Sequence, residues 1–282
     1  MLAEGLKYKK AMDYNEVFRY VKDGYLPFSG GTDVLIKAKE GFLRAEGLLY
    51  IGDMPDLLGI EEKESAIFIG AGVRISDIIE DPLIIGQFPG LVQALSLIGS
   101  PQIRNQATLG GNMGNCSPVA DSMPMLMALD AKAHIVSENN RRVVEVRDLP
   151  KGVCQTALQT GELIEKVEIP KRDDINLQFY RKFGQRKEVC IQKCSTAAVI
   201  SLDDDTVVRA AIAIGAVAVR ALRCDSAEEF LKGKKINEEN IRKACELISE
   251  EAKPITDIRS TVEYRKKMVG TGFYEKMMEL IR

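Results

Sequence analysis

The segment from Arg104 to Asp121 restricts what this 282-residue chain can fold into more than any other segment. It reads Arg-Asn-Gln-Ala-Thr-Leu-Gly-Gly-Asn-Met-Gly-Asn-Cys-Ser-Pro-Val-Ala-Asp, so three glycines lie among small polar side chains. Such a segment has little apolar surface to bury, and glycine loses much backbone entropy on ordering. Glycines also let a backbone approach a ligand closely, and free N–H groups bind anionic oxygens. The composition is therefore typical of either a ligand-binding segment or a glycine-rich surface loop.

A second glycine segment lies well upstream, in Pro27-Phe28-Ser29-Gly30-Gly31-Thr32-Asp33. A β-rich run over 25–28 enters a Gly-Gly turn, and a helical pattern then continues to about Lys39. Thr32 or Asp33 is expected to cap that helix, whose N-terminus offers unpaired N–H groups to an anion. The chain has no G-x-x-x-x-G-K-[ST] and no G-x-G-x-x-G after a strand, so neither a P-loop nor a Rossmann unit is expected.

The remaining patterns predict an α+β protein in two parts, residues 1–172 and 175–282, joined through a charged segment over 171–174. In the first part, Asp13 and Glu16 form a capping box for a helix that ends near Gly24. Ser76 or Asp77 is expected to cap another helix, and Pro89 to begin a third. The second part is expected to be an antiparallel sheet covered by helices. Its strands are predicted at 177–183, 194–201 and 207–214, and its helices at 227–232, 238–252 and 260–281.

Composition excludes several functional classes. A net charge of −2 gives no basic field for nucleic acid or an anionic membrane. No apolar run reaches transmembrane length, and the N-terminus lacks a signal-peptide core, so a cytoplasmic protein with reduced cysteines is expected. Cys190 and Cys194 are the closest of six cysteines, but no second pair or histidine accompanies them. We therefore do not expect them to bind metal, and iron–sulfur ligation within this chain is not expected.

Three motifs together carry a family resemblance. Ser-Gly-Gly-Thr-Asp at 29–33, Ala-Thr-Leu-Gly-Gly-Asn-Met-Gly-Asn-Cys-Ser-Pro-Val-Ala-Asp at 107–121 and Phe-Tyr-Arg-Lys-Phe-Gly-Gln-Arg-Lys at 179–187 follow in that order. They resemble the FAD-binding, or medium, subunit of the molybdenum hydroxylases, which include xanthine dehydrogenase and aerobic carbon monoxide dehydrogenase. The resemblance implies a two-lobed FAD domain of the vanillyl-alcohol-oxidase (PCMH) type. A smaller C-terminal domain of the type found in carbon monoxide dehydrogenase flavoproteins is implied to follow it.

The resemblance also implies which residues hold FAD. The implied positions are Phe28, Ser29, Gly30, Gly31, Thr32, Asp33, Ile98, Thr108, Gly110, Gly111, Asn112, Asn115, Asp121 and Lys182. The first glycine pair would cradle the diphosphate. A carboxylate beside a diphosphate costs Coulomb energy, so Asp33 is expected to cap the helix or to contact the edge of a ribose. A simple turn between a strand and a helix is the alternative reading of that pair.

Four single residues have specific implied roles. Asp121 resembles a contact to a ribose or ribityl chain, although an N-cap of the following helix is an alternative. The resemblance places Lys182 near the pyrimidine end of the flavin, where a cation raises the reduction potential of the flavin. The alternative is a strand lysine exposed to water. Ile98 stands where some members carry an aromatic residue that covers the flavin ring. The identity of the electron acceptor, NAD or another, therefore stays open. His134, the sole histidine, is expected to be half-buried in a strand, and the glycine segments contain no histidine, so FAD should be noncovalent.

The function implied by the resemblance is electron transfer. A large molybdopterin subunit would oxidise the substrate, and a small subunit with two [2Fe–2S] clusters would pass electrons to this flavin. NAD or another acceptor would then receive them, in a dimer of heterotrimers or a similar assembly. No residue of this chain is expected to be catalytic. Two alternatives are a self-contained flavin oxidoreductase with its own substrate and a non-enzymatic assembly protein with an empty flavin site.

Overall fold

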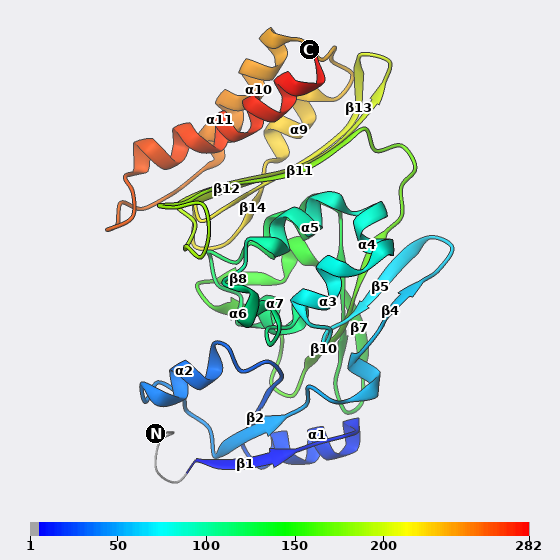
Figure 1. The fold of residues 1–282 in the computed structure, drawn as a ribbon, viewed down its shortest axis with the longest axis vertical. Helices are drawn as coiled ribbons and strands as arrows, with labels where there is room; N and C mark the ends of the chain where they lie inside the picture. The colour runs from blue at the N-terminus through cyan, green and yellow to red at the C-terminus, as the bar shows by residue number, and fades with distance from the viewer. Residues whose placement is uncertain (1–5, 282) are drawn as a thin grey trace.

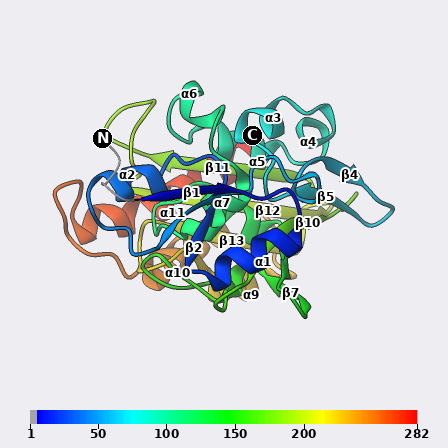
Figure 2. The same ribbon diagram turned by 90° about the horizontal axis from the view of Figure 1, so that it is seen from below.

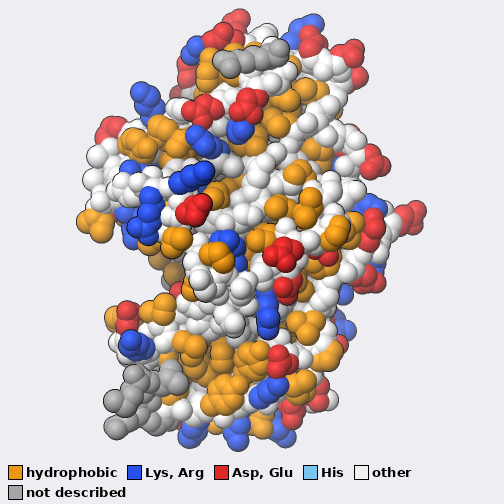
Figure 3. Space-filling model, in the orientation of Figure 1, with side chains coloured by type: hydrophobic (Ala, Val, Ile, Leu, Met, Phe, Trp, Pro, Cys, Tyr) orange, Lys and Arg blue, Asp and Glu red, His pale blue; other side chains and the backbone are white. Residues whose placement is uncertain are grey.

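The computed structural model of the chain describes residues 6–281 and shows three tiers of secondary structure (Figure 1). The N-terminal lobe forms the bottom tier, a second lobe forms the middle, and a sheet with long helices forms the top. The view from below places the N-terminal lobe in front of the other two tiers (Figure 2). On the face shown in Figure 3, acidic and basic side chains are interspersed with apolar ones, as the near balance of charges suggests.

The N-terminal lobe is a small parallel sheet with strand order β1-β3-β2. Its elements are β1 (Lys7–Lys10), α1 (Tyr14–Lys22), β2 (Tyr25–Phe28), α2 (Val34–Lys39), β3 (Gly47–Tyr50) and the 3-10 helix η1 (Pro55–Leu57). The N-cap half of the capping box is confirmed, because the Asp13 carboxylate accepts a hydrogen bond from the Glu16 N–H at 2.9 Å. The Glu16 carboxylate accepts from the Met12 N–H at 2.9 Å, one residue before the expected donor. Gly24 follows α1 with a φ of 84°, which a glycine adopts without strain.

The second lobe is built on a five-stranded antiparallel sheet with order β4-β5-β10-β6-β7. Its strands are β4 (Ile60–Glu62), β5 (Ala66–Gly70), β6 (Lys132–Val136), β7 (Arg141–Glu145) and β10 (Leu163–Pro170). Its helices are α3 (Ile75–Glu80), α4 (Pro82–Gln87), α5 (Pro89–Ser96), α6 (Pro101–Arg104), α7 (Leu109–Asn115) and α8 (Ser122–Ala128). The 3-10 helix η2 (Val146–Asp148) and a small hairpin of β8 (Pro150–Gly152) and β9 (Gln155–Thr156) complete it.

Two helix starts in this lobe differ from the sequence prediction. The expected cap of α3 by Ser76 or Asp77 is wrong, because α3 begins at Ile75 and no side chain caps it. The Ser76 hydroxyl instead donates to the Asp77 carboxylate at 3.2 Å. Helix α4 was not predicted, although Asp81 accepts hydrogen bonds from the N–H groups of Leu83 and Ile84 and a proline opens the helix.

The C-terminal part is the expected antiparallel sheet covered by helices. Strand order is β11-β12-β13-β14, and the strands are β11 (Leu177–Phe183), β12 (Cys194–Asp203), β13 (Thr206–Gly215) and β14 (Leu222–Arg223). The helices are α9 (Asp225–Leu231), α10 (Glu238–Glu251) and α11 (Val262–Leu280). Alternation along β11 sends Phe179 toward α11, where it contacts Phe273, and sends Tyr180 toward the second lobe.

The second lobe and the C-terminal sheet share one hydrophobic core. Ala197 and Val199 of β12 and Ala211 and Ala213 of β13 are fully buried against the helices and strands of the second lobe. Helix α8, whose residues are all buried, packs on β13 from this side. The opposite face of the sheet forms a separate core with α9, α10 and α11. The sheet is therefore buried on both faces.

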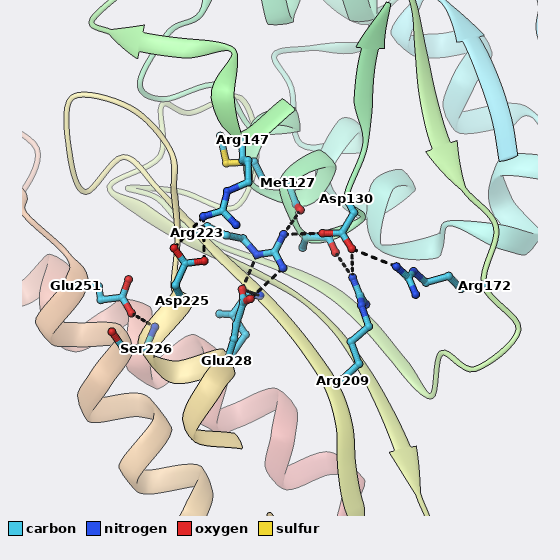
Figure 4. Close-up of polar contacts among 12 residues, drawn as sticks. Met127, Asp130, Arg147, Arg172, Arg209, Arg223, Asp225, Ser226, Glu228 and Glu251 are labelled. Atoms are coloured by element: carbon cyan, nitrogen blue, oxygen red, sulfur yellow. Dashed lines mark hydrogen bonds and ion pairs between the residues drawn. The ribbon is translucent and has the colours of Figure 1, made fainter. Parts of the chain in front are cut away.

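A polar cluster fastens the two parts at the edge of this shared core (Figure 4). Asp130, which follows α8 with a φ of 53°, accepts hydrogen bonds from Arg223 at 2.8 Å and Arg209 at 2.5 Å. Arg172 also contacts the same carboxylate, and Arg223 binds Glu228 as well. Burial opposes ionisation of Asp130, but the bonds and charges of Arg223 and Arg209 outweigh it and hold its pKa below the ordinary value.

Replacing Asp130 by Asn should lower the free energy of unfolding at pH 7 by about 1–2 kcal/mol, because Arg223 and Arg209 lose an ionised acceptor. The Asp130 pKa is lower in the folded than in the unfolded chain, so its contribution is present above the ordinary pKa and lost as the pH falls. The difference between the two proteins should therefore shrink below about pH 4. Urea unfolding at pH 7 and pH 3 measures this. Glu138→Gln, at an exposed pair with Lys22, is the control; equal effects of both substitutions at pH 7 would contradict the assignment.

Candidate functional site

A cavity of about 670 Å³ lies between the N-terminal lobe and the second lobe. Both glycine segments line it, together with residues after η2 and at the start of β10. The wall includes Phe28, Ser29, Gly30, Gly31, Thr32, Asp33, Thr108, Gly110, Gly111, Asn112 and Asn115. A groove of about 650 Å³ between α1 and the β6–β7 turn contains none of these residues. The first cavity is therefore the candidate site.

The two glycine segments touch each other directly. A Cβ atom on Gly30 would lie 1.9 Å from the Gln106 carbonyl oxygen and 3.0 Å from the Ala107 Cα. Within the second lobe, a Cβ atom on Gly110 would lie 2.5 Å from the Ala71 Cβ, so α7 packs directly on the residue after β5. No side chain fits at such distances, so glycine is required at position 30 for the two segments to meet and at position 110 for α7 to pack on the second lobe.

The turn before α2 leaves a run of backbone donors free. Gly31 has a φ of 73°, and its carbonyl accepts a hydrogen bond from the Leu35 N–H at 3.1 Å. Within residues 6–281, the N–H groups of residues 30–34 have no hydrogen-bond acceptor in the protein. Successive N–H groups in such a turn bind anionic oxygens, so this wall of the cavity suits a phosphate group.

The glycines of the downstream segment lie in helix α7, so the alternative of a glycine-rich surface loop is not observed. Thr108 is the N-cap of α7, and its hydroxyl accepts from the Gly111 N–H at 3.2 Å. The N–H groups of Leu109 and Gly110 donate to carbonyls of Val73 and Ala71. These N–H groups therefore already have acceptors, and the free backbone donors lie on the upstream turn instead.

The expected capping role of Asp33 is wrong. Asp33 occupies the N-cap position of α2, but its side chain makes no capping hydrogen bond. Its carboxylate instead pairs with Lys37 one turn later, at 2.6 Å. Lys37 also donates to the Asn115 side-chain oxygen at 2.7 Å, and it lines the cavity. Sequence reasoning missed Lys37, although its spacing of four residues from Asp33 on a predicted helix was a usable signal.

Three implied site residues lie together in a buried group outside the cavity wall. Lys182 pairs with Asp121 at 2.9 Å and donates to the Leu97 carbonyl, next to Ile98, at 3.0 Å. Tyr180 donates to the other Asp121 oxygen at 2.7 Å. Both charged side chains are more than nine-tenths buried, since 9% of Asp121 and 6% of Lys182 are exposed. Burial raises the pKa of Asp121, and the Lys182 charge and the two hydrogen bonds oppose the rise.

The buried group is joined to the cavity wall by a short hydrogen bond. Ser122, directly after Asp121, donates to the Asn112 side-chain oxygen at 2.5 Å, and Asn112 lines the cavity. Asp121 occupies the N-cap position of α8 without making a capping bond, so that alternative role is not observed. Lys182 is buried and paired with Asp121, so the alternative of a strand lysine exposed to water is not observed.

The histidine and most of the cysteines lie apart from the cavity, but Cys154 lines it and Cys116 directly follows the wall residue Asn115. His134 of β6 is half-buried as expected and contacts the Glu168 carboxylate at 2.7 Å. Cys194 is buried, which raises the pKa of its thiol to about 12, and the Cys190 thiol contacts the Arg186 carbonyl. Over residues 6–281, no three His, Cys, Asp or Glu side chains gather as a metal site. In the same range, every helix is too short or too polar to cross a membrane.

Comparisons with known proteins identify the family. Residues 5–172 match the FAD binding domain in molybdopterin dehydrogenase, and residues 178–280 match the CO dehydrogenase flavoprotein C-terminal domain. The carbon monoxide dehydrogenase medium chain of Hydrogenophaga pseudoflava is 29% identical over 86% of this chain and 84% of its own. The glyceraldehyde dehydrogenase medium chain of Sulfolobus acidocaldarius is 26% identical over 93% of both chains.

The fold agrees with these matches. A solved structure of Hydrogenophaga pseudoflava carbon monoxide dehydrogenase, in a form lacking the Mo-pyranopterin moiety of its cofactor, superposes with a TM-score of 0.94. The two chains are 27% identical, and the match covers 99% of this chain and 98% of the other. The resemblance found in the sequence motifs is thereby confirmed. This chain belongs to the molybdenum hydroxylase family, as a medium subunit with the FAD binding domain of molybdopterin dehydrogenases.

Proposed function

We propose that this chain is the FAD-carrying electron-transfer subunit of a molybdenum hydroxylase complex. It takes electrons from [2Fe–2S] clusters of a small partner subunit and passes them to NAD or another acceptor. A large molybdopterin-binding subunit oxidises the substrate, and the assembly is a dimer of heterotrimers or a similar complex. A cytoplasmic location is proposed with it, which the six unbridged cysteines of the chain support.

The observation that carries the proposal is the cavity between the two glycine segments. Its upstream wall offers the free N–H groups of residues 30–34, which suit the diphosphate of FAD. Its downstream wall offers polar side chains of α7, among them Asn112 and Asn115. The described cavity therefore fits the cofactor that the family uses.

We assign the cavity residues named above to the diphosphate and the adjoining parts of FAD. We assign Ile98, Asp121 and Lys182 to its sugar and flavin parts. Asp121 lies behind the wall, linked to it through Ser122 and Asn112, and it keeps lone-pair sites beyond the two hydrogen bonds that it accepts. FAD supplies the chemistry when bound, because it accepts electrons singly and donates them in pairs. The chain itself binds and orients the cofactor, and we assign no acid–base residue to it.

The purified chain, mixed with FAD and desalted, should show flavin absorption bands at a ratio near one FAD per chain. Acid precipitation should release all of this FAD, because the proposed binding is noncovalent. Co-expression with the neighbouring large and small subunits should then give a complex that contains molybdenum and iron and reduces NAD or another acceptor. A chain without flavin bands after FAD addition would contradict the proposal. Oxidation of an organic substrate by the isolated chain would instead support a self-contained oxidoreductase.

A further inference from the structure

Lys37 is the residue that ties the two walls of the cavity together. It belongs to α2 on the upstream wall, and it reaches the Asn115 side chain at the end of α7 on the downstream wall. The two residues are 78 positions apart in the chain. The Asp33 carboxylate holds the same ammonium group at 2.6 Å. Lys37 is therefore fixed at the cavity wall by two acceptors, although 41% of its side chain is exposed.

The cavity wall carries as many acidic as basic residues, so it offers a dianionic ligand no excess of positive charge. The acidic residues of the wall are Asp33 and Glu162, and its basic residues are Lys37 and Arg44. Glu162 is bound by Arg142 through two hydrogen bonds of 2.6 and 2.7 Å. Asp33 lies in the same turn as the free N–H groups, where its charge would repel a phosphate group. Lys37 removes this repulsion, because it neutralises Asp33 directly.

The geometry leaves one bonding position of Lys37 open. A lysine ammonium group has three N–H donors, and Asp33 and Asn115 accept two of them. No other acceptor for this ammonium group is found in the part of the chain that the structure describes, so its third donor remains for an anionic oxygen in the cavity. Asn115 and Asp33 at the same time fix the side chain, so little rotamer entropy would be lost when a ligand binds.

We propose that the Lys37 ammonium group is the counter-ion that this cavity supplies to the diphosphate of FAD. The inference rests on the proposed flavin site and adds a residue to it. Lys37 donates its third N–H to a diphosphate oxygen, keeps Asp33 neutralised and holds α2 against α7. The free backbone N–H groups of residues 30–34 provide the remaining donors.

Binding of FAD and of ADP to the full-length chain, freed of FAD, tests this role. Lys37→Met should raise the dissociation constants of both ligands about tenfold or more, since a hydrogen bond to a charged group is lost. The variant should also show a weaker dependence of ADP affinity on salt concentration, because one cation no longer faces the ligand. Lys37→Arg should restore most of the affinity. Asp33→Asn, added to Lys37→Met, should restore part of it, because the remaining repulsion is removed.

Lys39→Met is the matched control, because Lys39 lies on the same short helix, is exposed and does not line the cavity. It should bind both ligands as the unchanged chain does. If Lys37→Met binds ADP with unchanged affinity and salt dependence while the unchanged chain binds FAD, this inference is wrong and the proposed function stands. If Arg44→Met alone reproduces the loss, Arg44 is the counter-ion and the inference is also wrong. A chain that binds neither FAD nor ADP overturns both.

Discussion

Replacing Gly30 by Val is expected to lower the affinity for FAD more than about a hundredfold, so the variant should purify almost without flavin. The added Cβ would lie 1.9 Å from the Gln106 carbonyl oxygen, far inside van der Waals contact. That oxygen belongs to the backbone and cannot rotate away, so the two glycine segments must separate by more than an ångström. Displacements of about 1 Å in a binding site cost roughly a hundredfold in function, and both cavity walls are displaced here.

The measurement is the flavin-to-protein absorbance ratio, together with a titration of the FAD-free chain. Gly86→Ala is a suitable control, because no heavy atom lies within 4 Å of the position its Cβ would occupy. Gly86 lies inside α4, where alanine should increase stability by up to about 1 kcal/mol and leave FAD content unchanged. Full FAD content in Gly30→Val would show that the two segments do not need to touch.

Asp121→Ala is expected to lower the free energy of unfolding by about 3–5 kcal/mol, because it leaves the buried Lys182 ammonium group without its counter-ion. The Tyr180 hydroxyl, which is also buried, loses its acceptor in the same variant. Lys182→Met should cost less, because the new side chain is apolar and Asp121 can take up a proton. Urea unfolding of the FAD-free chain measures these effects without a contribution from cofactor binding.

The double variant Asp121→Ala/Lys182→Met separates the pair from its surroundings. It should be more stable than Asp121→Ala alone, because no uncompensated buried charge remains. Glu138→Ala breaks an exposed ion pair with Lys22 and should change stability far less than Asp121→Ala. If Asp121→Ala and Glu138→Ala lower the free energy of unfolding equally, Lys182 does not depend on Asp121 as its buried counter-ion.

Local signals predicted most of the helices and strands. The Asp13 capping box and the alternation along β11 act within a few residues, so the sequence shows them directly. Helix α7 was not predicted, since glycine disfavours helix and the Thr108 cap is only effective once Gly110 packs on Ala71. Strand β1 was missed for a similar reason, because all four of its residues are exposed and only pairing with β3 defines it.

The cavity itself was predictable, because glycines in two segments signal close approach of backbones. The partners of individual charges were not. Asp121 and Lys182 are 61 positions apart, and Lys37 and Asn115 are 78 apart, so only the tertiary fold brings them together. The position of the free N–H groups was not predictable either, because Val73 and Ala71 of the second lobe accept the first N–H groups of α7 and leave the upstream turn as the donor.

The core shared by α8, β12 and β13 means that the family boundary near residue 175 does not mark a separable folding unit. A fragment cut there would expose the buried side of α8 and the alanine-rich face of the sheet to water. Neither fragment alone could bury this apolar surface. A chimera that joins the C-terminal part of this chain to the FAD domain of a distant relative would therefore need matched interior residues on both sides of the junction.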